Sequence, residues 1–126
     1  MKVLEVHLSA SAAGEYVVLQ NQGLTTLSLR GWALCGDAYL SGEVAAAAGQ
    51  MHVFLDDVPV RPYTRVVLFT GEGQGGWCPT TDGKQAYLVY WGRSECVWRR
   101  CARVHVLRMC ASYPVGREAE DMAATG

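Results

Sequence analysis

Short runs of β-branched and aromatic residues, each closed by turn-forming residues, dominate this sequence. Residues 15–20 read E-Y-V-V-L-Q and stop at Asn21, and residues 64–70 read T-R-V-V-L-F-T and stop at Gly71. Runs of this length and composition are typical of β-strands. The other runs of this kind are residues 3–8, 25–30, 32–35, 51–55, 86–91 and 103–109. Seven or eight short strands, with a turn about every ten residues, predict an all-β sandwich or barrel.

Two segments lack this β pattern, and both are short. Residues 43–48 (E-V-A-A-A-A) contain good helix formers, but six residues between Gly42 and Gly49 make a marginal helix. We therefore expect a loop or a single turn there. Residues 71–76 (G-E-G-Q-G-G) offer almost no side chains for a core and predict a connecting loop.

The length of the chain fits one domain. Of its 126 residues, half are hydrophobic and 18% are charged, which is enough apolar material for a single core and argues against disorder. We expect the domain to span residues 1–112. Residues 113–126 are small and polar, and we expect a partly disordered C-terminal tail there.

The pattern after the second β-run resembles the lamin tail domain family. That family opens with an acidic or polar residue, a β-run and Asn, followed by a Leu-x-Gly-Trp-x-Leu segment. Here these are residues 15–21 and residues 29–34 (L-R-G-W-A-L). The likeness continues in residues 62–69, after a proline turn, and at the tryptophans ahead of the closing run.

The sequence also departs from the family pattern in two places. Where many members have Trp-Asn-Asn-x-Gly-Asp, residues 98–103 read W-R-R-C-A-R, and the expected Pro-Gly turn is Pro62-Tyr63. The resemblance implies an immunoglobulin-like sandwich of two mainly antiparallel sheets with about 7–9 short strands. It places Gly31 in a turn, with Trp32 and Leu34 in the core.

No catalytic motif is present in the sequence. The three histidines (His7, His52 and His105) fall in separate β-runs without an acidic residue at a telling spacing, and alternation places His7 and His105 on outer faces. Gly-x-Ser-x-Gly, P-loop and His-Glu-x-x-His motifs are absent. The pair Asp56-Asp57 reads as a solvated loop. We expect no enzymatic activity and no cofactor.

The chain has five cysteines, an odd number that favours a reducing compartment over a complete disulfide framework. They are Cys35, Cys78, Cys96, Cys101 and Cys110. No Cys-x2-4-Cys pair suggests zinc, so we expect no metal. A Cys96–Cys101 disulfide stays open as an alternative.

The first residues do not read as a signal peptide, and no apolar run approaches a membrane span. The expected location is the cytoplasm, or the exterior if a leader was removed.

Net charge is −1, but basic residues gather near the end of the chain. We call the candidate binding residues the arginine stripe; they are Arg93, Trp98, Arg99, Arg100, Arg103 and Arg108. Arginine binds phosphates and carboxylates, and tryptophan stacks on bases. The alternative is that the arginines solubilise a hairpin edge.

These features predict a non-catalytic interaction or anchoring module that binds a protein or a polyanion. What is known of lamin tails, which are implicated in contacts with DNA, chromatin and proteins, points the same way, although a fold does not fix a function. The alternative is a structural domain that assembles into homo-oligomers through residues 86–91 as an edge strand.

Overall fold

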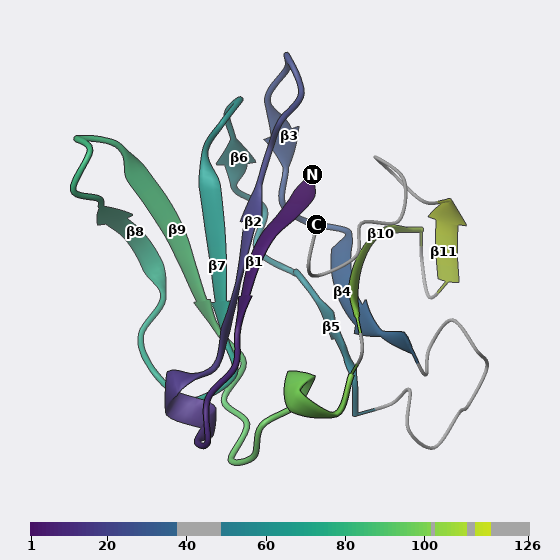
Figure 1. Ribbon diagram of the computed structural model, residues 1–126. Helices are drawn as coiled ribbons and strands as arrows, with labels where there is room; N and C mark the ends of the chain where they lie inside the picture. Colours follow the sequence, from purple (N-terminus) through teal and green to yellow (C-terminus); the bar gives the residue numbers. More distant parts are fainter. Residues whose placement is uncertain (38–48, 102, 111–112, 117–126) are drawn as a thin grey trace.

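The described residues form two β-sheets and a short two-stranded ribbon (Figure 1). The computed structural model describes residues 1–37, 49–101, 103–110 and 113–116, and of Arg100, Met109, Cys110 and residues 113–116 it describes the main chain. The loop expected at residues 43–48 lies outside the described residues.

The larger sheet has five strands in the order β1-β2-β7-β9-β8. Their bounds are Lys2–His7 (β1), Tyr16–Gln20 (β2), Arg65–Phe69 (β7), Gly76–Pro79 (β8) and Gln85–Tyr90 (β9). All neighbouring pairs are antiparallel except β7 and β9, which run parallel. In β1 the register shifts between Val3 and Glu5, so that both Val3 and Val6 contribute to the core.

The second sheet has four strands in the order β11-β10-β4-β5, and β3 pairs with β6 in the ribbon. The bounds are Leu27–Ser28 (β3), Trp32–Gly36 (β4), Met51–Val53 (β5), Pro59–Val60 (β6), Val104–Cys110 (β10) and Tyr113–Gly116 (β11). Two 3₁₀ turns, η1 (Ala12–Gly14) and η2 (Trp98–Arg100), lie in the connections before β2 and β10.

The core lies between the two sheets, as the alternation of apolar residues predicts. From the larger sheet it takes Val17, Leu19, Val66 and Leu68, all fully buried. From the smaller sheet it takes Trp32, Leu34, Val104 and Val106. The predicted all-β sandwich is confirmed, with one parallel strand pair in an otherwise antiparallel arrangement.

The Gly31-Trp32 turn takes the form expected of it. Gly31 has a φ of 91°, in the left-handed region that favours glycine. Its N–H donates to the Phe54 carbonyl at 3.1 Å, and the Trp32 N–H donates to the Leu29 carbonyl at 3.2 Å. Trp32 and Leu34 are both buried, so the prediction that they belong to the core is confirmed.

A row of aromatic rings crosses the outer face of the larger sheet. His7, Tyr16, Phe69 and Tyr90 are register partners on β1, β2, β7 and β9. The His7 and Tyr16 ring centroids are 4.7 Å apart and nearly parallel, and so are those of Phe69 and Tyr90. Cross-strand aromatic contacts of this kind stabilise a sheet.

The expected edge strand needs correction, and three strands were not expected. The run at residues 86–91 was expected at an edge, but β9 is paired on one side with β7 and on the other with β8. It therefore offers no edge for self-assembly. The sequence did not predict β6, β8 or β11, and β11 pairs with β10 beyond the expected boundary at residue 112.

Candidate functional site

Trp98 was expected to be a stacking platform in the arginine stripe, and this prediction is wrong. Its side chain is only 1% exposed and belongs to the core. The Trp98 and Trp91 ring centroids are 5.7 Å apart. A ring enclosed by the core cannot stack on a nucleic acid base.

The arginines of the stripe are attached to different elements. The Arg93 guanidinium lies 5.2 Å from the centroid of the Trp91 ring, and that of Arg108 lies 5.8 Å from the centroid of the Trp32 ring. Arg99, in η2, is exposed. The Arg100 side chain lies outside the described part of the chain.

Arg103 is exposed just before β10, whereas Arg108 lies near the far end of that strand. Five residues of strand span about 16 Å. The stripe is therefore continuous in sequence but does not form one compact cluster in space.

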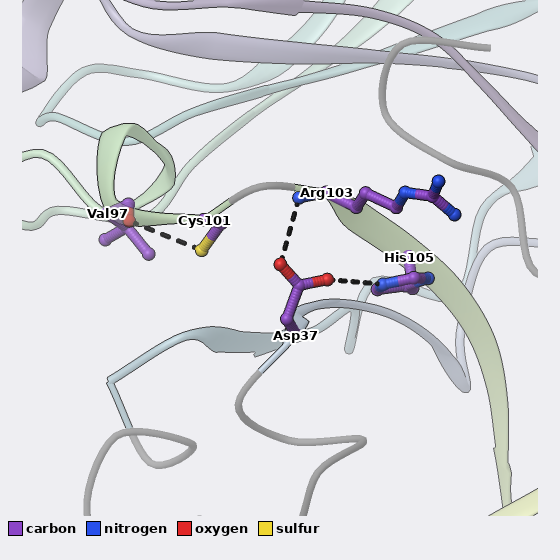
Figure 2. Close-up of polar contacts among 5 residues, drawn as sticks. All are labelled: Asp37, Val97, Cys101, Arg103 and His105. Atoms are coloured by element: carbon purple, nitrogen blue, oxygen red, sulfur yellow. Dashed lines mark hydrogen bonds and ion pairs between the residues drawn. The ribbon is translucent and has the colours of Figure 1, made fainter.

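His105 pairs with an acidic residue that the sequence spacing concealed. Its Nε2 lies 3.0 Å from Asp37 Oδ1, and the other oxygen of Asp37 accepts a hydrogen bond from the Arg103 main-chain N–H at 3.1 Å (Figure 2). Because 68 positions separate Asp37 from His105, only the pairing of β4 with β10 brings them together.

His105 lies on the face of β10 opposite the core residues Val104 and Val106, as alternation predicts, but it is buried there rather than solvated, with 7% of it exposed. Alternation predicts which face a side chain lies on but not whether that face is solvated, and Ala33, Cys35 and Leu107 on the same side of this sheet are buried as well. His7, by contrast, is exposed as expected.

Cys101 lies beside this pair but is not an activated thiol. Its Sγ is 3.7 Å from the Val97 carbonyl oxygen (Figure 2). Burial, followed by the negative charges of Asp37 and Glu15, raises the pKa of Cys101 to about 11. A thiol with that pKa stays protonated near neutral pH and is a poor nucleophile or metal ligand.

His52 is held as a neutral ring. Its ring centroid is 4.9 Å from that of Phe54 and 5.1 Å from that of Trp91, with edge-to-face geometry. Burial lowers the pKa of His52 to about 4. Nearby, Asp56 accepts a hydrogen bond from the Tyr87 hydroxyl at 2.7 Å, which raises the pKa of Tyr87 to about 12.

A groove that the sequence did not reveal opens at one end of the larger sheet. It has a volume of about 480 Å³, within the range of roughly 300–1,000 Å³ common for ligand sites. Figure 1 places β6 and the turn between β8 and β9 at this same end. The lining residues are Pro59, Arg61, Pro62, Tyr63, Thr64, Trp77, Lys84 and Gln85.

The first wall of the groove is a tight turn at Pro62-Tyr63. The Thr64 N–H donates to the Arg61 carbonyl at 3.0 Å, which closes the turn. Tyr63 follows proline with a φ of 64°, the left-handed conformation that a type II turn demands at its third position and that usually calls for glycine. The Gln20 side-chain amide donates to the Tyr63 carbonyl at 3.0 Å and holds this geometry. The Tyr63 ring is left 55% exposed.

The second wall is the hairpin of β8 and β9. Trp77 lies on β8, the last strand of the sheet, opposite Tyr87 in register. The two ring centroids are 5.1 Å apart in an edge-to-face contact. This contact fixes one side of the indole, while the Trp77 side chain remains 41% exposed.

The groove and its border are positively charged. Arg61 and Lys84 line the groove, and Arg65 lines an adjoining hollow together with Tyr63 and Lys84. All three cations are exposed, and in the described part of the chain none forms an ion pair.

The one acidic residue that lines the groove or the hollow, Asp82, lies in the adjoining hollow. Its carboxylate is engaged within its own turn by the Thr80 hydroxyl and the Lys84 N–H. The hydrogen bond from Thr80, followed by that from the Lys84 main chain, lowers the pKa of Asp82.

The described residues show neither a cluster of three or more His, Cys, Asp or Glu side chains placed to bind a metal nor a helix long and apolar enough to cross a membrane. Cys78, Cys96 and Cys101 are free thiols. No protein-family model, curated protein or solved structure matches this chain.

Proposed function

We propose that this protein is a non-catalytic interaction module that binds an anionic partner in the groove between the Pro62-Tyr63 turn and the β8–β9 hairpin. The observation that carries the proposal is the set of three exposed cations: Arg61 and Lys84 line the groove, and Arg65 lines the hollow that adjoins it. Exposed cations with low-dielectric walls concentrate the local field even on a protein whose net charge is close to zero.

The chemistry of Cys101 and His52 supports a binding role over catalysis. The Cys101 thiol has a pKa of about 11, and the His52 ring has a pKa of about 4. A nucleophile needs a lowered thiol pKa, and a general base works best with a pKa near the working pH. Neither group meets that requirement.

We further infer a module of the lamin-tail type. Support comes from the left-handed Gly31, from the buried Trp32 and from the left-handed backbone of Tyr63, which stands where the family has the glycine of a Pro-Gly turn. Fold likeness does not itself assign a partner. The choice of an anionic partner therefore rests on the groove.

The test compares two double variants with the same loss of charge. We expect Arg61→Ala/Lys84→Ala to bind fluorescein-labelled heparin at least about tenfold more weakly than the parent at low salt, since each cation releases counterions from a polyanion. Arg99→Ala/Arg103→Ala, which removes two exposed arginines of the stripe, should change the affinity less than about twofold.

Fluorescence anisotropy at two salt concentrations measures both variants. If both variants lose the same affinity for heparin, the attraction is diffuse rather than centred on the groove. If only Arg99→Ala/Arg103→Ala loses affinity, the binding site is the arginine stripe. If the parent binds no polyanion at low salt, the proposal is wrong. Size-exclusion chromatography of the parent would then test self-association, the alternative role.

A further inference from the structure

We propose that the groove takes a single strand of nucleic acid, with unpaired bases stacked on Tyr63 and Trp77 and phosphates on Arg61, Arg65 and Lys84. The inference rests on the proposed function, because it names the class of anion that the same groove binds. It adds a role for the two aromatic rings, which a purely electrostatic site does not need.

Two exposed aromatic side chains on separate elements line one groove. Tyr63 comes from the turn before β7 and Trp77 from β8, and both rank among the most exposed large apolar side chains in the described part of the chain. Exposed apolar side chains that gather at one hollow mark a binding site, whereas scattered single ones do not. Bases have flat faces that stack on tyrosine and tryptophan, and each stacked base strengthens binding by roughly ten- to a hundredfold.

The positions of the cations match this arrangement. Arg61 and Lys84 line the same groove as the two rings, and Arg65 lines the adjoining hollow together with Tyr63. Grooves that bind single strands combine aromatic platforms for the bases with basic side chains along the backbone. A duplex keeps its base faces covered by stacking, so it would not use both rings.

The backbone of Tyr63 adds an independent indication. A tyrosine with a φ of 64° is strained in a turn position where glycine would be relaxed. Strained residues persist where the surrounding structure enforces them, and they cluster at binding sites. Here the strain places a large ring at the wall of the groove.

Because the Tyr63 backbone is strained, the variant Tyr63→Gly can test binding without destabilising the fold. Tyr63→Gly removes the ring and relieves the backbone, so its melting temperature should equal or exceed that of the parent. Tyr63→Phe keeps the ring and removes the hydroxyl. Trp77→Ala removes the second ring, and Arg61→Ala/Lys84→Ala removes two of the charges.

Binding is measured by fluorescence anisotropy with a labelled oligothymidylate of about 12 nucleotides, with an abasic oligomer of the same length and with heparin. We expect Tyr63→Gly and Trp77→Ala each to weaken oligothymidylate binding roughly tenfold. The same two variants should bind the abasic oligomer and heparin as the parent does, and Tyr63→Phe should keep the parent affinity for all three probes. The variant Arg61→Ala/Lys84→Ala should weaken binding to all three.

The outcomes separate the two proposals. If the parent binds the abasic oligomer as tightly as oligothymidylate, or if Tyr63→Gly and Trp77→Ala bind oligothymidylate normally, the single-strand inference is wrong while the anionic groove stands. Tighter binding of polyglutamate than of oligothymidylate would also overturn it, in favour of an acidic peptide. If Arg61→Ala/Lys84→Ala binds every probe as the parent does, both proposals fail.

Discussion

The Glu15 carboxylate accepts a hydrogen bond from the Trp98 main-chain N–H at 3.3 Å, although the two residues are 83 positions apart. The same oxygen accepts hydrogen bonds from the Val97 N–H at 2.9 Å and from the Thr70 hydroxyl at 2.7 Å. Glu15 is fully buried. One carboxylate therefore joins the start of β2, the end of β7 and the turn η2, which leads into β10.

Removing this carboxylate should destabilise the fold strongly. Glu15→Ala leaves three buried donors without an acceptor, and each unsatisfied group costs about 1–3 kcal/mol. We expect the free energy of unfolding to fall by about 3–5 kcal/mol in urea titrations. The exposed Glu95→Ala should change it by less than about 0.5 kcal/mol. A Glu15→Ala protein as stable as the parent would show that these hydrogen bonds do not hold η2 in place.

The Gly31-Trp32 turn gives a second stability prediction. Because Trp32 is buried against both sheets, Trp32→Ala should lower the free energy of unfolding by about 3–5 kcal/mol. Leu24→Ala, at a side chain that is almost wholly exposed, serves as the control in the same thermal melts. A Trp32→Ala melting temperature within about 2 °C of the parent would contradict the place of Trp32 in the core.

The buried His52 predicts a loss of stability in mild acid. Its folded pKa of about 4 lies below the usual histidine value of 6.5, so between these two values the unfolded chain binds a proton that the folded protein does not. Stability should therefore fall as the pH drops from about 6.5 to about 4, by at most about 3 kcal/mol.

His52→Phe keeps a ring against Phe54 and Trp91 while removing the titrating group. Urea unfolding of both proteins at several pH values gives the difference attributable to His52. If the free energy of unfolding changes with pH in the same way in the parent and in His52→Phe, the lowered pKa of His52 is contradicted.

The cysteines should differ sharply in reactivity. Cys78 is exposed on β8, Cys35 is buried, and burial together with nearby acids raises the pKa of Cys101 to about 11. Because the thiolate is the reactive form, iodoacetamide at pH 8 should alkylate Cys78 first in the folded protein. Mass spectrometry follows the reaction, and Cys78→Ser should remove its fast phase.

Unfolded, unreduced protein should then yield four or five free thiols. Finding only one free thiol would mean that two disulfides form. A fast phase that survives in Cys78→Ser would assign the reactive thiol to another cysteine.

Much of the fold follows from the sequence because it depends on local pattern. The β-branched run that became β7 and the Gly31-Trp32 turn each specify their own conformation. The short strands β6 and β8 contain proline or glycine and lack such a pattern, and they form because neighbouring strands supply hydrogen-bond partners. The burial of His105 was missed for a related reason, since alternation cannot reveal that both faces of a sheet are covered.

The candidate site was harder to predict than the fold. The arginine stripe is a cluster in sequence, and Trp98 within it is buried. The groove takes its residues from segments about twenty positions apart, which come together only through the pairing of β7, β9 and β8. The one local signal was Tyr63 after Pro62, at a turn position where the family has glycine.

The most direct test of the groove is an amide and indole NMR titration of the ¹⁵N-labelled parent with oligothymidylate at low salt. We predict chemical-shift changes centred on Arg61, Tyr63, Lys84 and the Trp77 indole, with the buried indoles of Trp32 and Trp98 unchanged as controls within the same spectrum. Changes centred instead on Arg99 and Arg103, or no changes at all, would contradict the account.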